Sequence, residues 1–411
     1  MNFSLYYFSL FFLLLFGPKF GAYIDLISIT SIYLLIRYFN YSIDRYSFAL
    51  ILILMLYTIH CLSIFLISGH LDTWHAFQPI RFGINVLGIA TFISYLKAMG
   101  RSYLEVVSYF ELAVCLHAVI CIVMFFHPEF KNLVYSSTGF LEKSYTRVAG
   151  LTHSYGIPSV MMSLAFATIA FKENVFVNQS TRYLLLFVTG FGLLLTARSG
   201  LYIAPILFFF AVCLRSGAAG VIKGLGILSI SVLILFSTFD FLTSMKGSYE
   251  GQLGVFINES IYHAFEVFVS WRAGGPLEIS SLETITKFDW HNTGILEVVF
   301  GTGDFGRGEV SRLDTDIAYL HIFSMVGIVG SITLVSIYIM PWIFALIRGR
   351  SFTEVGVIFL VSSLMLLMHY KQSILLVRGV SSSFLILSLS ILIMNSPQFN
   401  PRRRRSAIDV R

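Results

Sequence analysis

The chain has 411 residues, of which 56% are hydrophobic and only 12% are charged, with a net charge of +6. Soluble globular proteins carry about 25% charged residues, so this composition excludes a soluble enzyme or binding domain. The apolar residues lie in long blocks, whereas an outer-membrane barrel alternates apolar and polar residues in short segments. We therefore predict an all-α polytopic integral membrane protein.

Twelve apolar runs come close to the roughly 20 residues that cross a bilayer as a helix. The predicted spans are 3–17, 22–38, 48–68, 79–99, 104–127, 156–172, 183–197, 199–214, 219–241, 316–346, 352–369 and 374–394. The first run has neither a basic leader nor a small-residue cleavage site, so it is predicted to stay as a span. Only the letters ARS divide the seventh and eighth runs, a pattern that also fits one bent hairpin or one broken helix.

The basic residues predict the direction of each span, because cytoplasmic loops are enriched in Lys and Arg. With the N-terminus inside, each of five short inner loops has two basic residues, and each short outer loop has at most one. The inner pairs are Arg37 and Arg45, Lys97 and Arg101, Lys172 and Arg182, Arg215 and Lys223, and Arg348 and Arg350. Both termini are therefore predicted to be cytoplasmic.

The predicted organisation is one transmembrane domain, residues 1–394, followed by a basic tail, residues 395–411, that includes Arg402–Arg405. A basic run can bind nucleic acid or anionic lipid. After a last span we interpret it as a cytoplasmic topology anchor and expect no nucleic-acid partner. The four cysteines lie inside apolar runs, which favours packing residues over disulfides or metal ligands.

Two long loops are predicted on the outer side, at about 128–155 and about 242–315. The second is the large hydrophilic loop, with ten acidic and five basic residues and several aromatic ones. Its stretch 258–271 has apolar residues at helical spacing, which predicts an amphipathic helix on the outer face. We expect this loop to pack over the outer end of the spans.

The motif GTGDFG at 301–306 fits the dinucleotide pattern G-x-G-x-x-G, but it lacks the surrounding strand and helix. A glycine turn where the large loop returns to the membrane is the interpretation we adopt. Asp314 and Asp316 follow it, and carboxylates there can cap the next span. Gly327 and Gly330 are expected to permit close packing of that span.

Several basic groups stand at the predicted outer ends of spans, where a structural and a functional interpretation compete. Arg81, Arg198 and Arg378 fit simple snorkelling to the interface, but membrane arginines usually face a polar cavity. Arg147 and His153 precede the span at 156–172, where they fit either a solvated loop or a binding site.

The ordered set of these motifs resembles the O-antigen polymerase (Wzy) and O-antigen ligase superfamily. It comprises "RVAGLTHSYGIPSVMMSLA", the inter-span turn "TARSG", the loop end "VVFGTGDFG" and the span "TDIAYLHIFSMVGIVGS". The resemblance covers roughly residues 147–345. The D-x-x-Y start of the last segment, Asp316 to Tyr319, looks more polymerase-like than ligase-like.

The resemblance implies a metal-independent glycosyltransferase without a cofactor, in a bacterial inner membrane. Its substrate would be an oligosaccharide on undecaprenyl pyrophosphate, transferred at the periplasmic face to a sugar hydroxyl of a lipid-linked repeat unit. Membrane lipids, a chain-length regulator and a flippase are the partners implied. Because the planar fork of arginine suits pyrophosphate, arginines are expected in the site.

The residues expected to serve this chemistry follow from the same resemblance. The catalytic set is Arg147 on the pyrophosphate, with His153, His291 and Asp316 as alternative bases; Asp314 is a further alternative. The substrate-binding set is Arg81, Arg198, Arg272, Arg307, Arg312 and Arg378, with Trp271 and Trp290 for sugar faces.

Three other functions remain open at this point. A ligase would transfer the glycan to lipid A-core, a flippase or secondary transporter would move it, and an export subunit would be non-catalytic. A transporter normally places polar residues near the middle of the membrane, whereas here they lie at the predicted outer rim. An export subunit would have no need of the rim arginines.

Overall fold

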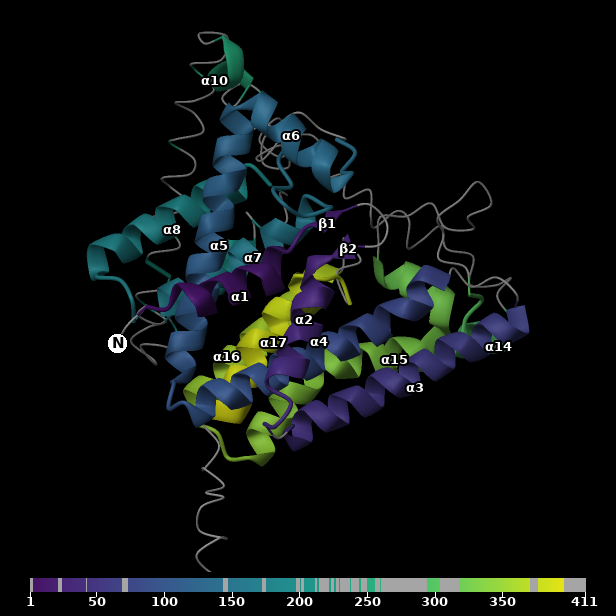
Figure 1. Cartoon of the computed structure of the whole chain (residues 1–411). Coiled ribbons are helices and arrows are strands. Elements are labelled where there is room, and N and C mark those ends of the chain that lie inside the picture. Colours follow the sequence, from purple (N-terminus) through teal and green to yellow (C-terminus); the bar gives the residue numbers. More distant parts are fainter. Residues whose placement is uncertain are drawn as a thin grey trace, which may run out of the picture.

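A computed structural model of the chain describes residues 3–20, 24–41, 43–68, 73–142, 147–171, 175–196, 200, 203–210, 250–255, 294–303, 318–369 and 376–394, with a few isolated positions. Figure 1 shows these residues as a helical protein with one short strand pair. In chain order the elements are α1 Leu5–Phe16, β1 Lys19–Phe20, β2 Ile24–Asp25, α2 Leu26–Arg37, α3 Arg45–Ser68, α4 Thr73–Ala98, α5 Tyr103–Phe126, α6 Pro128–Thr138, α7 Gly156–Phe171, α8 Gln179–Leu194, α10 Gly251–Val255, α14 Ile295–Phe300, α15 Ala318–Ile347, α16 Phe352–His369, α17 Val380–Leu389 and the π-helical turn η2 Ser390–Met394.

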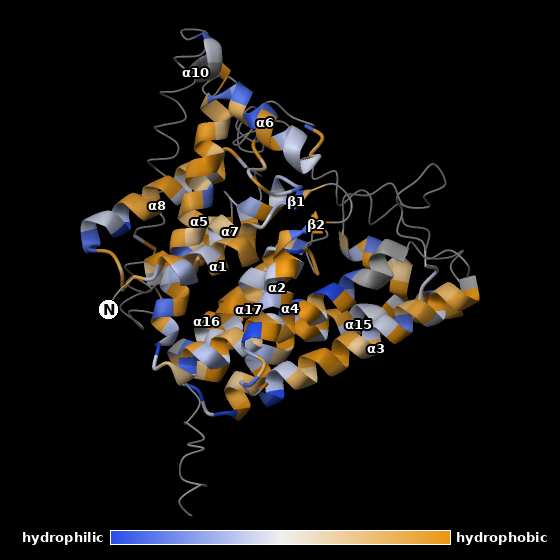
Figure 2. Ribbon diagram, viewed as in Figure 1, coloured by the Kyte–Doolittle hydropathy of each residue, from blue (hydrophilic) through white to orange (hydrophobic). Residues whose placement is uncertain are grey.

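The helices have the apolar character of a multi-pass membrane protein, as Figure 2 shows by hydropathy. Four are long and apolar enough to cross a bilayer: Arg45–Ile67, Gln78–Ala98, Tyr103–Phe126 and Ala318–Ile347. Five shorter apolar helices are Leu5–Phe16, Leu26–Arg37, Gly156–Ala170, Glu354–His369 and Val380–Met394. The all-α membrane fold is thus confirmed, while the count of twelve spans, their sidedness and the periplasmic loop remain predictions.

Some sequence predictions fall outside the described residues. The predicted span 219–241 and the amphipathic stretch 258–271 are in this group, and 199–214 is described as a helix only over 203–210. The first predicted outer loop, 128–155, contains a helix of its own, α6. Pro128 is well placed at its start, and Gly139 ends it in the left-handed conformation (φ 68°).

Helix α4 packs against α2 and also against α17, so the three helices form one group. At one end of this group lie Asp25, which caps α2, and Arg81, in the third turn of α4. At the other end, Lys97 of α4 meets the last turn of η2 at Ile393. Arg81 and Lys97 are about 24 Å apart along α4, at about 1.5 Å per residue. Each end of the group therefore carries a polar cluster.

The cluster at the Lys97 end caps the last helix of the described chain. Lys97 Nζ donates to the Ile393 carbonyl at 2.8 Å. The Leu392 carbonyl accepts from Arg348 Nη1 at 3.1 Å and from Arg350 Nη2 at 2.8 Å. The last carbonyls of a helix have no partner within the helix and carry its negative dipole end. These basic side chains satisfy them.

Arg182 does the same for α7. Its Nε donates to the Ile169 carbonyl at 2.8 Å and its Nη2 to the Ala170 carbonyl at 3.0 Å. Basic residues from three predicted inner loops thus bind helix C-termini, which gives these charges a structural role beside their predicted topological one.

Helix α15 is broken at Gly327, where φ is 63° and ψ is −168°. The break frees carbonyls that lipid could not satisfy. The Ser324 carbonyl accepts from Thr302 N at 2.8 Å, and the Met325 carbonyl from Gly303 N at 2.9 Å. The Val326 carbonyl accepts from His60 Nε2 of α3 at 2.8 Å. All three carbonyls next to the break are therefore satisfied inside the protein.

The glycines at this junction allow backbone to meet backbone. Gly301 and Gly327 both have positive φ, and a methyl group on either would overlap the main chain of the other segment. The described part of the GTGDFG motif, Gly301–Gly303, is thus a junction between α14 and the broken α15. Gly330 lies against His60, where an added Cβ would come within 2.9 Å of Cδ2, and it permits the predicted close packing.

Candidate functional site

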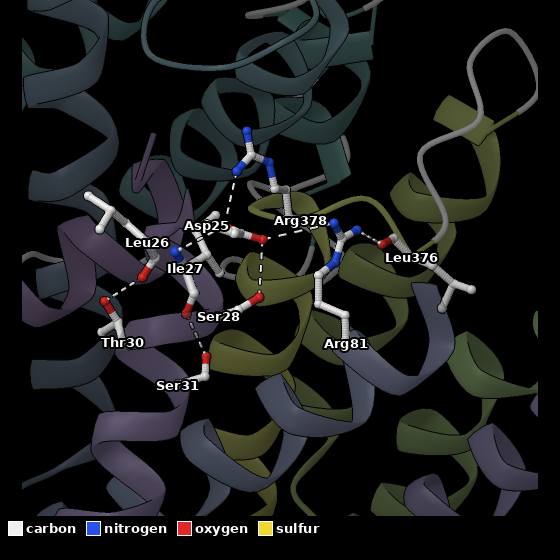
Figure 3. A network of polar contacts seen from close by, with 9 residues as sticks. All are labelled: Asp25, Leu26, Ile27, Ser28, Thr30, Ser31, Arg81, Leu376 and Arg378. Carbon is white, nitrogen blue, oxygen red and sulfur yellow. Dashed lines mark hydrogen bonds and ion pairs between the residues drawn. The ribbon is translucent and has the colours of Figure 1, made fainter. Parts of the chain in front are cut away.

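A polar cluster centred on Asp25 lies where β2, α4 and the segment before α17 meet (Figure 3). Arg378 Nη1 donates to Asp25 Oδ1 at 3.0 Å, and Arg81 Nη1 lies 3.9 Å from Asp25 Oδ2. All three side chains are largely buried, with 9% of Arg378, 13% of Asp25 and 19% of Arg81 exposed. One carboxylate thus holds two guanidinium groups from distant parts of the chain.

The position of Asp25 follows from the local sequence. It is the N-cap of α2, and its Oδ1 accepts from Ile27 N at 3.2 Å while its Oδ2 accepts from Ser28 Oγ at 3.1 Å. Aspartate is among the best N-cap residues because its side chain accepts from the free N–H groups of the first turn. The cap fixes the carboxylate at the end of α2, and the arginines approach its remaining side.

Lys19 joins the cluster through the strand pair. In the antiparallel register of β1 and β2, Lys19 is directly opposite Asp25. The pKa of Lys19 is lowered by burial first and then by the positive charges of Arg378 and Arg81, while Asp25 offsets part of the shift. With Lys19, Arg81 and Arg378 against Asp25, the cluster holds three basic side chains and one acidic one.

Arg378 is presented by a strained turn. Leu376 has φ of 62°, a left-handed conformation that a leucine rarely adopts, and Gly379 has φ of 79°. A Cβ on Gly379 would lie 2.6 Å from the Leu15 carbonyl oxygen, so the backbone of this turn packs closely against the end of α1. Arg81 Nη2 donates to the Leu376 carbonyl at 3.4 Å. Strain of this kind costs on the order of 1–3 kcal/mol and concentrates at functional sites.

His153 faces the same charges. Burial, and then Arg378 and Lys19, lower its pKa to about 4, and Asp25 opposes the shift. The imidazole is therefore neutral at neutral pH and can accept a hydrogen bond. It lies in the segment that leads into α7, whose first described residue is Arg147.

That segment is tied down by its own backbone. Val148 N donates to the Leu195 carbonyl at 2.8 Å, Ala149 N to Tyr135 Oη at 2.9 Å, and Leu151 N to His117 Nε2 at 3.1 Å. Arg147, half-buried, begins this segment. Arg147 and His153, which precede the predicted span 156–172, thus lie on one segment whose backbone is held by hydrogen bonds.

Four of the sequence-predicted site residues are described, namely Arg81, Arg147, His153 and Arg378. Arg81 and Arg378 meet at Asp25, the charges of Arg378 and Lys19 act on the pKa of His153, and Arg147 is on the segment of His153. The others, Asp314, Asp316, His291, Arg198, Arg272, Arg307, Arg312, Trp271 and Trp290, lie outside the described residues.

The sequence analysis assigned neither Asp25 nor Lys19 to the site. Asp25 was placed inside the predicted span 22–38, whereas α2 begins at Leu26. Its place near the start of an apolar run could have indicated a paired carboxylate, because an ionisable residue inside a membrane costs free energy and is usually paired.

The arrangement is suited to an anion. Three cations around one carboxylate leave positive charge that phosphate or pyrophosphate oxygens can neutralise. Among the residues that the structure describes, no three His, Cys, Asp or Glu side chains gather as metal ligands would.

No model of a known protein family matches this chain, and a search of curated proteins finds no significant match. The functional argument therefore depends on the residues and on the geometry of the Asp25 cluster.

Proposed function

We propose that this protein is a polymerase of O-antigen or a related surface polysaccharide. It would transfer a glycan chain from undecaprenyl pyrophosphate to a lipid-linked repeat unit at the periplasmic face of the bacterial inner membrane, with both termini cytoplasmic. The motif resemblance over roughly 147–345 suggests the class. The observation that carries the proposal is the Asp25 cluster, because it gathers excess positive charge at one end of apolar helices.

In the proposed reaction, the bond between the donor sugar's anomeric carbon and the pyrophosphate oxygen breaks. The acceptor hydroxyl oxygen forms the new bond to that carbon, its proton passes to a base, and undecaprenyl pyrophosphate leaves as the anion. Arg378 and Arg81 would bind the pyrophosphate oxygens as their negative charge grows, with Lys19 adding charge. Arg147, on the neighbouring segment, would be a further pyrophosphate ligand.

We assign the proton acceptor to His153, the one sequence-predicted base among the residues that the structure describes. Its imidazole is neutral at neutral pH, so a lone pair is free to accept from a hydroxyl. The Asp25 oxygens already accept from Ile27, Ser28 and Arg378, which suits Asp25 to holding the arginines. Trp271, Trp290 and the loop arginines keep their proposed role in sugar binding, and a chain-length regulator and flippase remain proposed partners.

The glycan phenotype of a deletion strain tests this proposal. Core lipid capped with a single repeat unit, restored to a long ladder by the wild-type gene, is the expected result. Uncapped core with accumulated lipid-linked polymer would replace the polymerase by a ligase. A block in delivery of repeat units to the periplasm would indicate a flippase, and an unchanged ladder would contradict all three.

A further inference from the structure

The imidazole of His117, a wholly buried side chain of α5, lies between the two segments that supply Lys19 and His153 to the Asp25 cluster. On one face it stacks on Phe16, with ring centroids 3.9 Å apart and planes inclined by 7°. Phe16 ends α1, three residues before Lys19. At the ring edge, Nε2 lies 3.1 Å from the Leu151 N–H, two residues before His153.

The hydrogen bond fixes the protonation of the ring. A backbone N–H can only donate, so Nε2 must present a lone pair, and in the neutral imidazole the proton is then on Nδ1. Nδ1 lies 3.8 Å from Cys121 Sγ, one turn along α5, which is a weak acceptor. Phenylalanine could keep the stacking on Phe16 but would leave the Leu151 N–H without its acceptor.

The loop backbone is shaped to the ring. Gly150 has φ of 61°, and a methyl group there would overlap the His117 imidazole and lie 2.9 Å from Cys121 Sγ. Only a glycine lets the main chain lie this close while turning in the left-handed region. The hydrogen bonds of Val148 to Leu195 and of Ala149 to Tyr135 hold the preceding residues.

We propose that His117 is a positioning residue. It fixes where the Arg147–His153 segment lies relative to α1, and so holds His153 in place relative to Lys19 and Arg378. This inference rests on the proposed function for its consequence in polymerisation, but its structural content is independent of it. His117 touches no substrate; it acts through Leu151 and Phe16.

The test distinguishes the role of the Nε2 acceptor from the role of ring stacking on Phe16. His117→Phe keeps an aromatic ring, and His117→Gln places an amide oxygen near the position of Nε2. Trypsin is added to the purified full-length protein in detergent, and mass spectrometry follows cleavage after Arg147, which requires the tied segment to open. A lost buried hydrogen bond should raise this cleavage about tenfold in His117→Phe, while His117→Gln stays close to wild type. His60→Phe, which loses an imidazole bond at the α15 break, is the matched control and should not change it.

Equal cleavage in wild type and His117→Phe overturns the inference, and so does equal acceleration in the Phe and Gln variants, since the acceptor would then be irrelevant. If His117→Phe does not reach the membrane, Gly150→Ala is the second variant, and it should open the same bond. Polymer ladders are measured in parallel. Open segments with normal ladders would leave the positioning role standing and contradict the proposed role of Arg147 and His153.

Discussion

The basic side chains at the two ends of the group α2, α4 and α17 differ in the acceptors that they mainly bind. At the Lys97 end, Lys97, Arg348 and Arg350 donate to the main-chain carbonyls of Leu392 and Ile393. Arg348 also lies 3.9 Å from the Asp44 carboxylate there. At the Asp25 end, Arg81 also donates to the Leu376 carbonyl, but both arginines share one side-chain carboxylate.

The difference teaches how to separate a structural cation from a site cation. Carbonyls at a helix end are permanent, and a ligand cannot displace them without unwinding the helix. A carboxylate shared by more cations than it can neutralise leaves charge for a ligand, and its oxygens can be shared or exchanged. By this criterion Arg350 completes a helix and Arg378 is available for binding.

Among substitutions that test the difference between the two ends, we expect the largest loss of polymer from a change at Arg378. Arg378→Ala removes a guanidinium that would bind pyrophosphate in the transition state. A hydrogen bond to a charged group is worth roughly 1.5–3 kcal/mol and each 1.36 kcal/mol is tenfold in rate, so polymer yield should fall about a hundredfold. Arg378→Lys should restore only part of it, because lysine lacks the planar fork. Ladder intensity in a complemented deletion strain is the measurement.

The matched control is Arg350→Ala, from the opposite end, which should leave the ladder within about twofold of wild type at normal membrane level. If the two alanine variants lose polymer equally, the distinction between the ends is wrong. Immunoblots show whether either protein is missing from the membrane.

Arg147→Ala is expected to have the next largest effect, a loss of about ten- to a hundredfold in polymer by the same reasoning. Arg147→Lys should recover part of it. Because the backbone of this segment is held through Val148, Ala149 and Leu151, the protein should remain in the membrane at normal level. A normal ladder from Arg147→Ala would remove this residue from the proposed site.

Asp25→Asn tests the shared carboxylate directly. Asparagine caps helices about as well as aspartate, so the substitution removes charge and keeps the cap. Losing a partner from a buried ion pair should lower the free energy of unfolding by about 3 kcal/mol. Inorganic pyrophosphate should raise the thermal midpoint of the purified variant more than that of wild type, since both arginines lack their carboxylate. No pyrophosphate effect in either protein would count against an anion site.

The pH dependence of stability is expected to be smaller and comes from His153. Its pKa is lowered from 6.5 to about 4 in the folded state. Between these pH values His153 is protonated in the unfolded protein but not in the folded protein. The free energy of unfolding therefore falls as the pH drops from 6.5 to about 4, and it is fully retained above 6.5. Thermal midpoints of the purified protein at pH 7 and pH 5 should differ less in His153→Gln than in wild type. An identical drop would mean that His153 is not the group responsible.

The smallest effect is expected from Lys97→Ala. Removing one cation from a helix C-terminus costs about 0.3–1 kcal/mol, and Arg348 and Arg350 remain on the neighbouring carbonyl. The thermal midpoint should fall by only a few degrees, with the polymer ladder unchanged. A lost ladder with normal protein level would show that the Lys97 end also takes part in function.

The sequence predicted most of the helices because long apolar runs leave the backbone few alternatives in a membrane. It also indicated that Arg81 and Arg378 lie near the ends of apolar runs, since a residue there is placed by that run alone; their outer-rim position remains a prediction. These are local properties, readable within about 20 residues.

The tertiary structure decided which of those residues meet. Asp25 and Arg378 are 353 positions apart, and no periodicity in the chain indicates that contact. The pairing of Lys19 with Asp25 depends on a two-residue strand register, too short for a sequence pattern to predict. The break in α15 depends on donors brought by α3 and the Gly301–Gly303 junction, because a free carbonyl is tolerated in a membrane only where another segment satisfies it.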